Sequence, residues 1–182
     1  MKESLENVQQ ILKHAELIYT PQSLNLAIER LAKEISAVLS EQFPLVLSVM
    51  GGAIVFTGQL LPLLNFPLDF DYVHASRYNH AFQGSTLHWK IAPPAHVSGR
   101  VILVLDDVLD EGHTMAAVRQ RVLAMGATQF YCAVLADKTI GKEKPIRADF
   151  VGITLPNRLV FGFGIDIKGM WRNLPAIYAV KE

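Results

Sequence analysis

Four acidic residues fall within six positions near the middle of the chain. Asp106 and Asp107 directly follow an apolar run at residues 101–105, and Asp110 and Glu111 come shortly after. The run predicts a buried strand, and ligands of open α/β sheets bind beyond the carboxyl ends of the strands. Clustered carboxylates repel one another, so they need a cation or hydroxyl donors beside them. These residues therefore predict a ligand-binding site.

The same segment has the parts of a site for a phosphorylated ribose. Asp106 and Asp107 suit the hydroxyls of a ribose diol, and they also suit Mg²⁺, which prefers oxygen ligands. The turn at residues 111–114 precedes a predicted helix whose backbone N–H groups can hold a phosphate, and Thr114 adds a hydroxyl donor. The alternative is that the acids solvate a strand end and cap the helix. Four acids followed by a glycine and threonine turn fit that alternative poorly.

The composition of the whole chain narrows the classes of protein. A length of 182 residues fits one domain, residues 1–182. A formal net charge of zero argues against nucleic-acid binding, which requires a basic surface. Cys132 is the only cysteine, which excludes an internal disulfide and a cysteine-rich zinc site. The apolar run around Cys132 predicts a small buried side chain.

Nothing in the sequence predicts contact with a membrane. Residues 1–10 have no apolar signal core. No uncharged apolar run approaches the roughly 20 residues that cross a bilayer. We therefore expect a soluble protein of the cytoplasm.

The elements that must position the acidic segment alternate between strand and helix. Short apolar runs predict strands at residues 45–50, 68–75, 101–105, 130–136, 150–153 and 160–165. Helical stretches are predicted between them, at residues 54–64 and 113–125. This alternation predicts an α/β fold with a parallel sheet flanked by helices.

Three further segments have distinct patterns. Helical spacing of apolar residues over positions 5–18 predicts a first helix with Ser4 as its N-cap. A second helix is expected to start near Ser23. The long connection at residues 78–87 is either a mobile lid over the site or an irregular hairpin, and its spacing favours neither.

The histidines other than His113 are scattered along the chain, without the helical spacing of a metal site, and we expect structural roles for them. They are His14, His74, His80, His88 and His96.

The segment around the acids resembles the phosphoribosyl-diphosphate motif of the type I phosphoribosyltransferases. That motif has an apolar strand, two acids, two apolar residues, Asp, any residue, Gly, any residue and Thr, as residues 101–114 do. From about residue 45 onward, the chain is similar to the hypoxanthine-guanine branch of this family. The other matching positions are Met50, Gly51, Gly52, Tyr78, Lys138, residues 149–152, residues 161–166 and Arg172. The resemblance implies a parallel sheet flanked by helices, with a small hood built from N- and C-terminal segments.

The resemblance also implies a reaction of purine salvage. 5-Phosphoribosyl 1-diphosphate (PRPP) and hypoxanthine or guanine would give IMP or GMP and diphosphate. The implied cofactor is Mg²⁺: Asp106 and Asp107 would hold one ion through water, and Asp166 would serve a second ion on the diphosphate. Relatives in this branch assemble as homodimers or homotetramers, so a homo-oligomer is implied as well.

Roles for individual residues follow from the same resemblance. Asp110 is the implied general base or acid at purine N7, and Tyr78 lies on the implied loop that closes over the reacting centre. Lys138 is implied to donate to the 6-oxo group of the base. The implied substrate-binding residues are Gly51, Gly52, Asp106, Asp107, Glu111, Gly112, His113, Thr114, Lys138, Leu159, Val160 and Arg172.

The chain departs from the family pattern at two positions. Met50 stands where the family often has a lysine in its diphosphate loop, so one cationic contact is lost. Leu159 stands where an aromatic residue usually stacks on the purine, a contact worth about 1–3 kcal/mol. Glu111 and His113 occupy variable positions of the phosphate loop, and His113 either bonds phosphate or faces solvent.

Two other functions use similar residues. A non-catalytic sensor of nucleotides or PRPP on the same fold would be consistent with Met50 and Leu159. A phosphatase or phosphoacceptor domain would also use an acidic pair with Mg²⁺. However, the Asp-x-Asp phosphatase pattern requires an acid at position 108, which is Val108.

Overall fold

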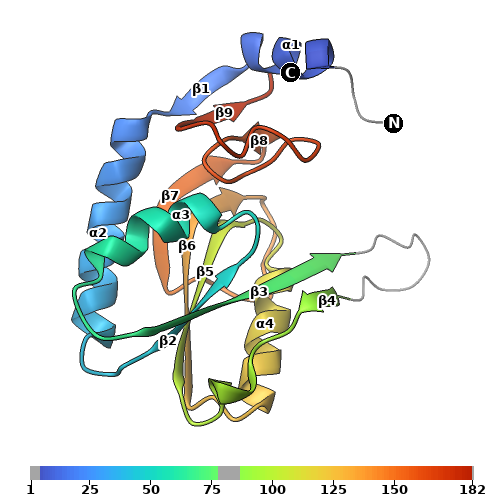
Figure 1. Ribbon diagram of the computed structural model, residues 1–182. Helices are drawn as coiled ribbons and strands as arrows, with labels where there is room; N and C mark the ends of the chain where they lie inside the picture. The colour runs from blue at the N-terminus through green and yellow to red at the C-terminus, as the bar shows by residue number, and fades with distance from the viewer. Residues whose placement is uncertain (1–4, 78–86, 182) are drawn as a thin grey trace.

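The computed structural model describes residues 5–77 and 87–181 (Figure 1). Its elements in chain order are α1 (Leu5–Lys13), β1 (Glu16–Tyr19), α2 (Pro21–Leu39), β2 (Leu45–Val49), α3 (Ile54–Leu60), η1 (Leu61–Leu63), β3 (Asp69–Arg77), β4 (Leu87–Ile91), η2 (Ala95–Val97), β5 (Val101–Leu109), α4 (His113–Ala124), β6 (Gln129–Thr139), β7 (Phe150–Pro156), β8 (Val160–Phe161) and β9 (Ile177–Ala179).

Six strands form the main sheet in the order β4-β3-β2-β5-β6-β7. The strands from β3 to β7 in this order pair in parallel, which confirms the predicted α/β architecture. β4 adds an antiparallel edge strand beside β3. A parallel pair needs a crossover of a dozen or more residues, and the connection between β3 and β4 is shorter than that. The expected lid or hairpin connection at residues 78–86 itself lies outside the described residues.

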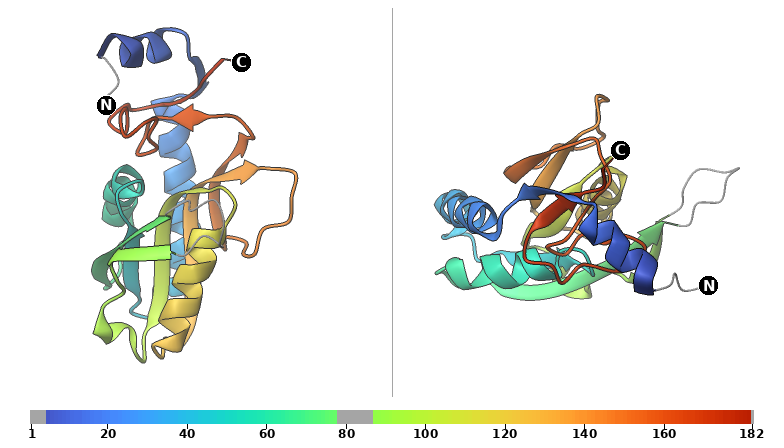
Figure 2. Two further views of the ribbon diagram at one scale, coloured as in Figure 1. Left: turned by 90° about the vertical axis from the view of Figure 1, so that its right-hand side faces the viewer. Right: turned by 90° about the horizontal axis from the view of Figure 1, so that it is seen from above.

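Helices cover both faces of the main sheet (Figures 1 and 2). On one face, α2 and α3 pack against a core that contains Leu31, Phe56 and Leu103. On the other face, α4 packs through Val118 onto a core that contains Val104. Leu103 and Val104 are fully buried because successive strand residues point to opposite faces and both faces are covered.

The strand order reverses between β2 and β5, which are neighbours in the sheet. After β2 the chain crosses through α3 to β3 on one side, and after β5 it crosses through α4 to β6 on the other. The two connections therefore separate above the carboxyl ends of β2 and β5. Such a switch point is where open α/β sheets bind their ligands.

A three-stranded antiparallel sheet, β1-β9-β8, forms the predicted hood (Figure 2). It joins the N-terminal and C-terminal segments, as expected. The single helix predicted over residues 5–18 was wrong at its end, because α1 stops at Lys13 and β1 follows. Residues of β1 instead pair with β9, in the register Leu17 to Tyr178. The predicted N-cap, Ser4, lies outside the described residues.

Several helices and strands end at residues other than those predicted from the sequence. The run at residues 160–165 was expected to be a strand of the main sheet, but only β8 is a strand and it belongs to the hood. Beyond it the chain turns at Gly162, which has φ 100°. The helix expected over residues 54–64 ends at Leu60 and continues as the short η1. β5 and β6 both run further than predicted, so the acidic pair and Lys138 lie within strands.

Cys132 in β6 is buried, as predicted. Burial raises the pKa of its thiol to about 12. None of the helices in residues 5–77 and 87–181 has both the length and the apolar character that crossing a membrane requires.

Candidate active site

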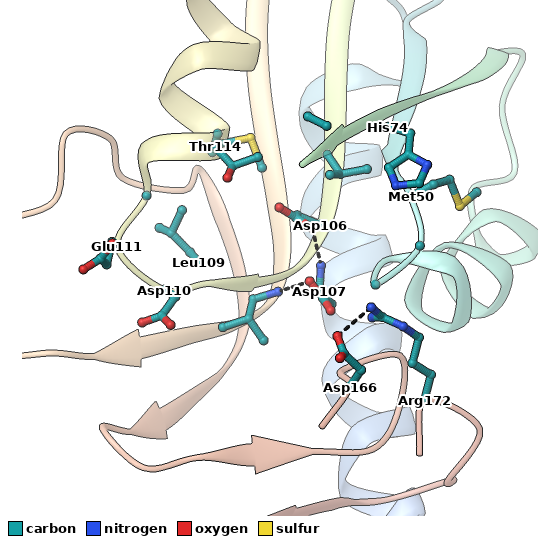
Figure 3. A pocket seen from close by; sticks show the side chains of 17 residues that line it. Met50, His74, Asp106, Asp107, Leu109, Asp110, Glu111, Thr114, Asp166 and Arg172 are labelled. Carbon is teal, nitrogen blue, oxygen red and sulfur yellow. Dashed lines mark hydrogen bonds and ion pairs between the residues drawn. The ribbon is translucent and has the colours of Figure 1, made fainter. Parts of the chain in front are cut away.

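A cleft of about 390 Å³ opens at the carboxyl ends of β2 and β5 (Figure 3). Its walls come from the ends of β2 and β3, from β5 and the turn into α4, and from the C-terminal segment. Most of the predicted site residues meet there: Gly51, Gly52, Asp106, Asp107, Asp110, Glu111, Gly112, Thr114, Asp166 and Arg172.

The acidic pair at the end of β5 carries closely spaced negative charge in a partly buried place. Burial raises the pKa of Asp106 well above its ordinary value of 3.8, and the neighbouring Asp107 carboxylate raises it further. Burial also raises the pKa of Asp107, while hydrogen bonds and the Arg172 guanidinium oppose that rise. Each carboxylate accepts a backbone N–H bond from the next residue, at 3.0 and 2.8 Å. Such a pair is suited to a cation or to hydroxyl donors.

The loop after β2 lies directly against Asp107. A Cβ atom on Gly52 would lie 2.1 Å from Asp107 Oδ2, so only glycine allows this approach. The loop also contains a cis peptide bond between Met50 and Gly51. Backbone groups of this loop thus line the cleft beside the acidic pair.

Replacing Gly52 with alanine is expected to displace the Asp107 carboxylate and to destabilise the protein by about 1–3 kcal/mol, because the added methyl group has no space. Gly51→Ala is the matched control, since no described atom lies within 4 Å of a Cβ at that position. Thermal unfolding of both variants measures the difference. Equal melting temperatures would contradict the steric argument.

The turn into α4 presents a helix N-terminus to the cleft. Gly112 is the N-cap in the left-handed conformation, with φ 79°, a backbone geometry that favours glycine. The first turn of a helix leaves backbone N–H groups without intrahelical partners, and these groups bind phosphate well. Thr114 lines the cleft within this first turn, whereas His113 is exposed and lies outside the lining.

The C-terminal segment closes the cleft with an ion pair. Arg172 Nη2 donates to Asp166 Oδ1 at 2.5 Å, and Arg172 Nη1 donates to the Gly164 carbonyl at 2.6 Å. The second oxygen of Asp166 accepts the Gly169 N–H at 2.7 Å. Figure 3 shows this pair on the side of the cleft away from Thr114. The guanidinium is therefore held in place to meet an anion.

Lys138 and Asp110 come together from neighbouring strands. Lys138 lies near the end of β6, and its Nζ is 3.5 Å from Asp110 Oδ2 just beyond β5. The lysine side chain is 14% exposed and the aspartate 55% exposed. An ammonium with three donors thus stands beside a carboxylate that solvent or substrate reaches.

Lys138 lines a neighbouring cavity instead of this cleft, and two other predicted residues also lie elsewhere. Leu159 is 58% exposed, and Val160 is buried in the hood as part of β8. Within the described part of the chain, neither one belongs to the cleft lining. Tyr78 lies outside the described residues.

His74 was assigned a structural role, but it lines the cleft near Met50 (Figure 3). It lies in β3, which pairs in parallel with β2. Parallel strands end at the same edge of a sheet. A polar residue near the end of the predicted strand at residues 68–75 therefore indicated a side chain at the ligand-binding edge.

The donor set suits a divalent cation that shares its ligands with a phosphate. In residues 5–77 and 87–181, no three His, Cys, Asp or Glu side chains converge to hold a metal ion on their own. Mg²⁺ usually binds through one or two carboxylates, several waters and substrate phosphates, which the acidic pair permits. The acidic pair, the helix N-terminus and Arg172 together describe a site for a phosphorylated sugar.

Comparison with known proteins also indicates a protein that binds a phosphorylated sugar. A family model described as a phosphoribosyl transferase domain matches residues 14–168. The chain therefore belongs to the phosphoribosyltransferase domain family. This membership decides against the phosphatase and phosphoacceptor alternatives.

Individual relatives match over nearly the whole chain. A hypoxanthine-guanine-xanthine phosphoribosyltransferase of Tritrichomonas foetus is 29% identical over 167 residues, which cover 91% of each chain. A hypoxanthine-guanine phosphoribosyltransferase of Bacillus subtilis (strain 168) is 29% identical and covers 94% of this chain and 97% of its own. A solved structure of a hypoxanthine-guanine-xanthine phosphoribosyltransferase has a TM-score of 0.78 at 28% identity, and the match covers 92% of this chain and 97% of that one.

Proposed function

We propose that this protein is a hypoxanthine-guanine phosphoribosyltransferase of purine salvage. It transfers the 5-phosphoribosyl group from PRPP to a 6-oxopurine and releases diphosphate. One observation carries the proposal: the acidic pair, the N-terminus of α4 and Arg172 face one cleft in a chain of the phosphoribosyltransferase family. The names of the relatives support a 6-oxopurine acceptor, since both name hypoxanthine and guanine and one also names xanthine.

Each wall of the cleft binds a different part of PRPP. Asp106 and Asp107 accept hydrogen bonds from the ribose hydroxyls, and the first turn of α4 with Thr114 holds the 5′-phosphate. Arg172 and the backbone N–H groups of the loop at Gly51 and Gly52 hold the diphosphate. Asp106 and Asp107 would hold one Mg²⁺ through water, and Asp166 would hold a second. Bound Mg²⁺ would neutralise the charge of the leaving diphosphate.

The base binds at the edge of the cleft, where Asp110 of the cleft lining meets Lys138 of a neighbouring cavity. The Lys138 ammonium donates to the 6-oxo group, and Asp110 takes or returns the proton at purine N7. The 3.5 Å contact between the two side chains supports this arrangement, because both would contact one planar ring.

Turnover tests this proposal against the alternative of a non-catalytic sensor. The protein would be incubated with Mg²⁺, labelled PRPP and each of hypoxanthine, guanine, xanthine and adenine, and labelled nucleotide would be separated from PRPP. We expect IMP and GMP to form. PRPP binding without any nucleotide would favour the sensor, in line with Met50 and the exposed Leu159.

Binding of PRPP is expected to require Mg²⁺ and the acidic pair. The clustered carboxylates would repel the naked diphosphate, so a cation must reverse the local charge. Calorimetry should detect tight PRPP binding with Mg²⁺, and none in EDTA or for the Asp106→Ala, Asp107→Ala double variant. Glu41→Ala with Glu143→Ala removes two exposed acids elsewhere and serves as the control. Unchanged affinity in EDTA would contradict the metal-bridged site.

We further propose that residues 1–182 form one domain and act in the cytoplasm as a homodimer or homotetramer. Apolar side chains that solvent reaches support an assembled form: Leu26 on α2, Ile54 on α3 and Leu63 on η1 are 66%, 54% and 38% exposed. Burial of such side chains between copies of the chain would remove apolar surface from water.

A further inference from the structure

Lys144 lies in the connection between β6 and β7, six residues after Lys138. Its Nζ donates to the Leu109 carbonyl at 2.7 Å, to Asp137 Oδ1 at 2.5 Å and to the Lys138 carbonyl at 2.7 Å. The side chain is only 11% exposed. An ammonium has three donors, so these contacts use all of them.

The three acceptors surround the proposed base-binding groups. Leu109 is the last residue of β5 and immediately precedes Asp110. Asp137 pairs with Leu109 across the ladder between β5 and β6. Lys138 follows Asp137 in β6. A single ammonium therefore joins the backbone that carries Asp110 to the backbone that carries Lys138.

The same segment also supports the phosphate-binding turn. A Cβ atom on Gly112 would lie 3.4 Å from Lys144 Cβ and 3.4 Å from Ile146 Cγ2, with Pro145 Cδ at 3.5 Å. The stem of Lys144 and its neighbours thus pack beneath the N-cap of α4. The aliphatic part of Lys144 lies beside the phosphate turn, and its ammonium contacts the two strand ends.

We propose that Lys144 is a positioning residue, which holds Asp110 and Lys138 at the separation that lets both contact one purine. The inference rests on the proposed roles of Asp110 and Lys138. A free strand end would let these side chains move apart, and a displacement of 1 Å in such a constellation can cost about 10²-fold in rate.

Lys144→Met tests this role, because methionine keeps the stem that packs against Gly112 and loses the three hydrogen bonds. We expect kcat/KM for hypoxanthine to fall about 10- to 100-fold, while calorimetry finds the affinity for PRPP with Mg²⁺ close to that of the parent. Lys142→Met is the matched control, an exposed lysine two residues earlier, and should retain the parental values.

A second variant separates positioning from simple neutralisation of Asp137. Lys144→Met leaves the Asp137 carboxylate without its ion pair, and Lys144→Met with Asp137→Asn removes that charge. We expect the double variant to regain melting temperature without regaining kcat/KM. Recovery of the parental kcat/KM would overturn the inference, because neutralising Asp137 would then be the whole effect.

Asp110→Asn and Lys138→Ala are measured in parallel to keep two failures apart. Parental kcat/KM in Lys144→Met, with both of these variants impaired, would overturn the role of Lys144 alone. Parental values in all three would overturn the proposed roles of Asp110 and Lys138, and the inference with them.

Discussion

Replacing Asp110 with asparagine is expected to lower kcat by about 10²–10⁴-fold, the usual contribution of a general acid or base. Asparagine has the shape of aspartate but cannot take up the N7 proton at neutral pH. Asp110 lies beyond the acidic pair, toward Lys138, so the affinity for PRPP with Mg²⁺ should stay close to that of the parent. Steady-state kinetics with saturating hypoxanthine and calorimetry with PRPP measure the two quantities.

Glu143→Gln is the control for this variant, since it removes an equal charge from an exposed acid outside the cleft lining of the described residues. It should leave both kcat and the affinity for PRPP unchanged. If Asp110→Asn turns over within a few-fold of the parent, Asp110 takes no part in proton transfer. Loss of PRPP binding in that variant would instead indicate that Asp110 contacts the ribose of PRPP.

The second large effect is expected in the choice of base. The parent should use hypoxanthine more efficiently than adenine by as much as about 10⁴-fold, because Lys138 offers only donors and the adenine 6-amino group is also a donor. Lys138→Ala should lose most of this preference, mainly through lower kcat/KM for hypoxanthine. The measurement is the ratio of kcat/KM for the two bases in the parent and the variant.

Two comparisons make the test of base selection specific. Lys142→Ala, an exposed lysine on the connection after β6, should keep the parental ratio. Leu159→Ala should also keep the parental ratio, because Leu159 is exposed and is absent from the cleft lining of the described residues. Equal use of adenine and hypoxanthine by the parent would mean that Lys138 does not select the base. The identity of the acceptor base would then be undetermined.

The sequence by itself determined the part of the site that is continuous along the chain. Strand, acidic pair, turn and helix follow one another within residues 101–125, so local rules place them at one edge of a sheet. The alternation of strands and helices predicted the α/β sheet for the same reason. Each parallel strand is buried on both faces and therefore reads as a short apolar run.

Only the tertiary structure decided which distant segments meet this strand end. Residues 15 and 18 fit a helical stripe, but β1 forms because β9 offers it a partner more than 150 residues later. His74 reaches the cleft because β3 neighbours β2, and Leu159 remains exposed beside the buried Val160 of the hood. Periodicity reports one chain segment at a time, whereas these positions depend on strand order and on long-range hydrogen bonds.

The role of a single side chain, Lys144, is likewise not predictable from the sequence alone. In the sequence it is one of several basic residues in a polar connection. Its significance comes from three acceptors on two strand ends, one of them 35 residues away. Such convergence is a property of packing, because backbone carbonyls are present at every residue and only the folded chain brings these two to a single ammonium.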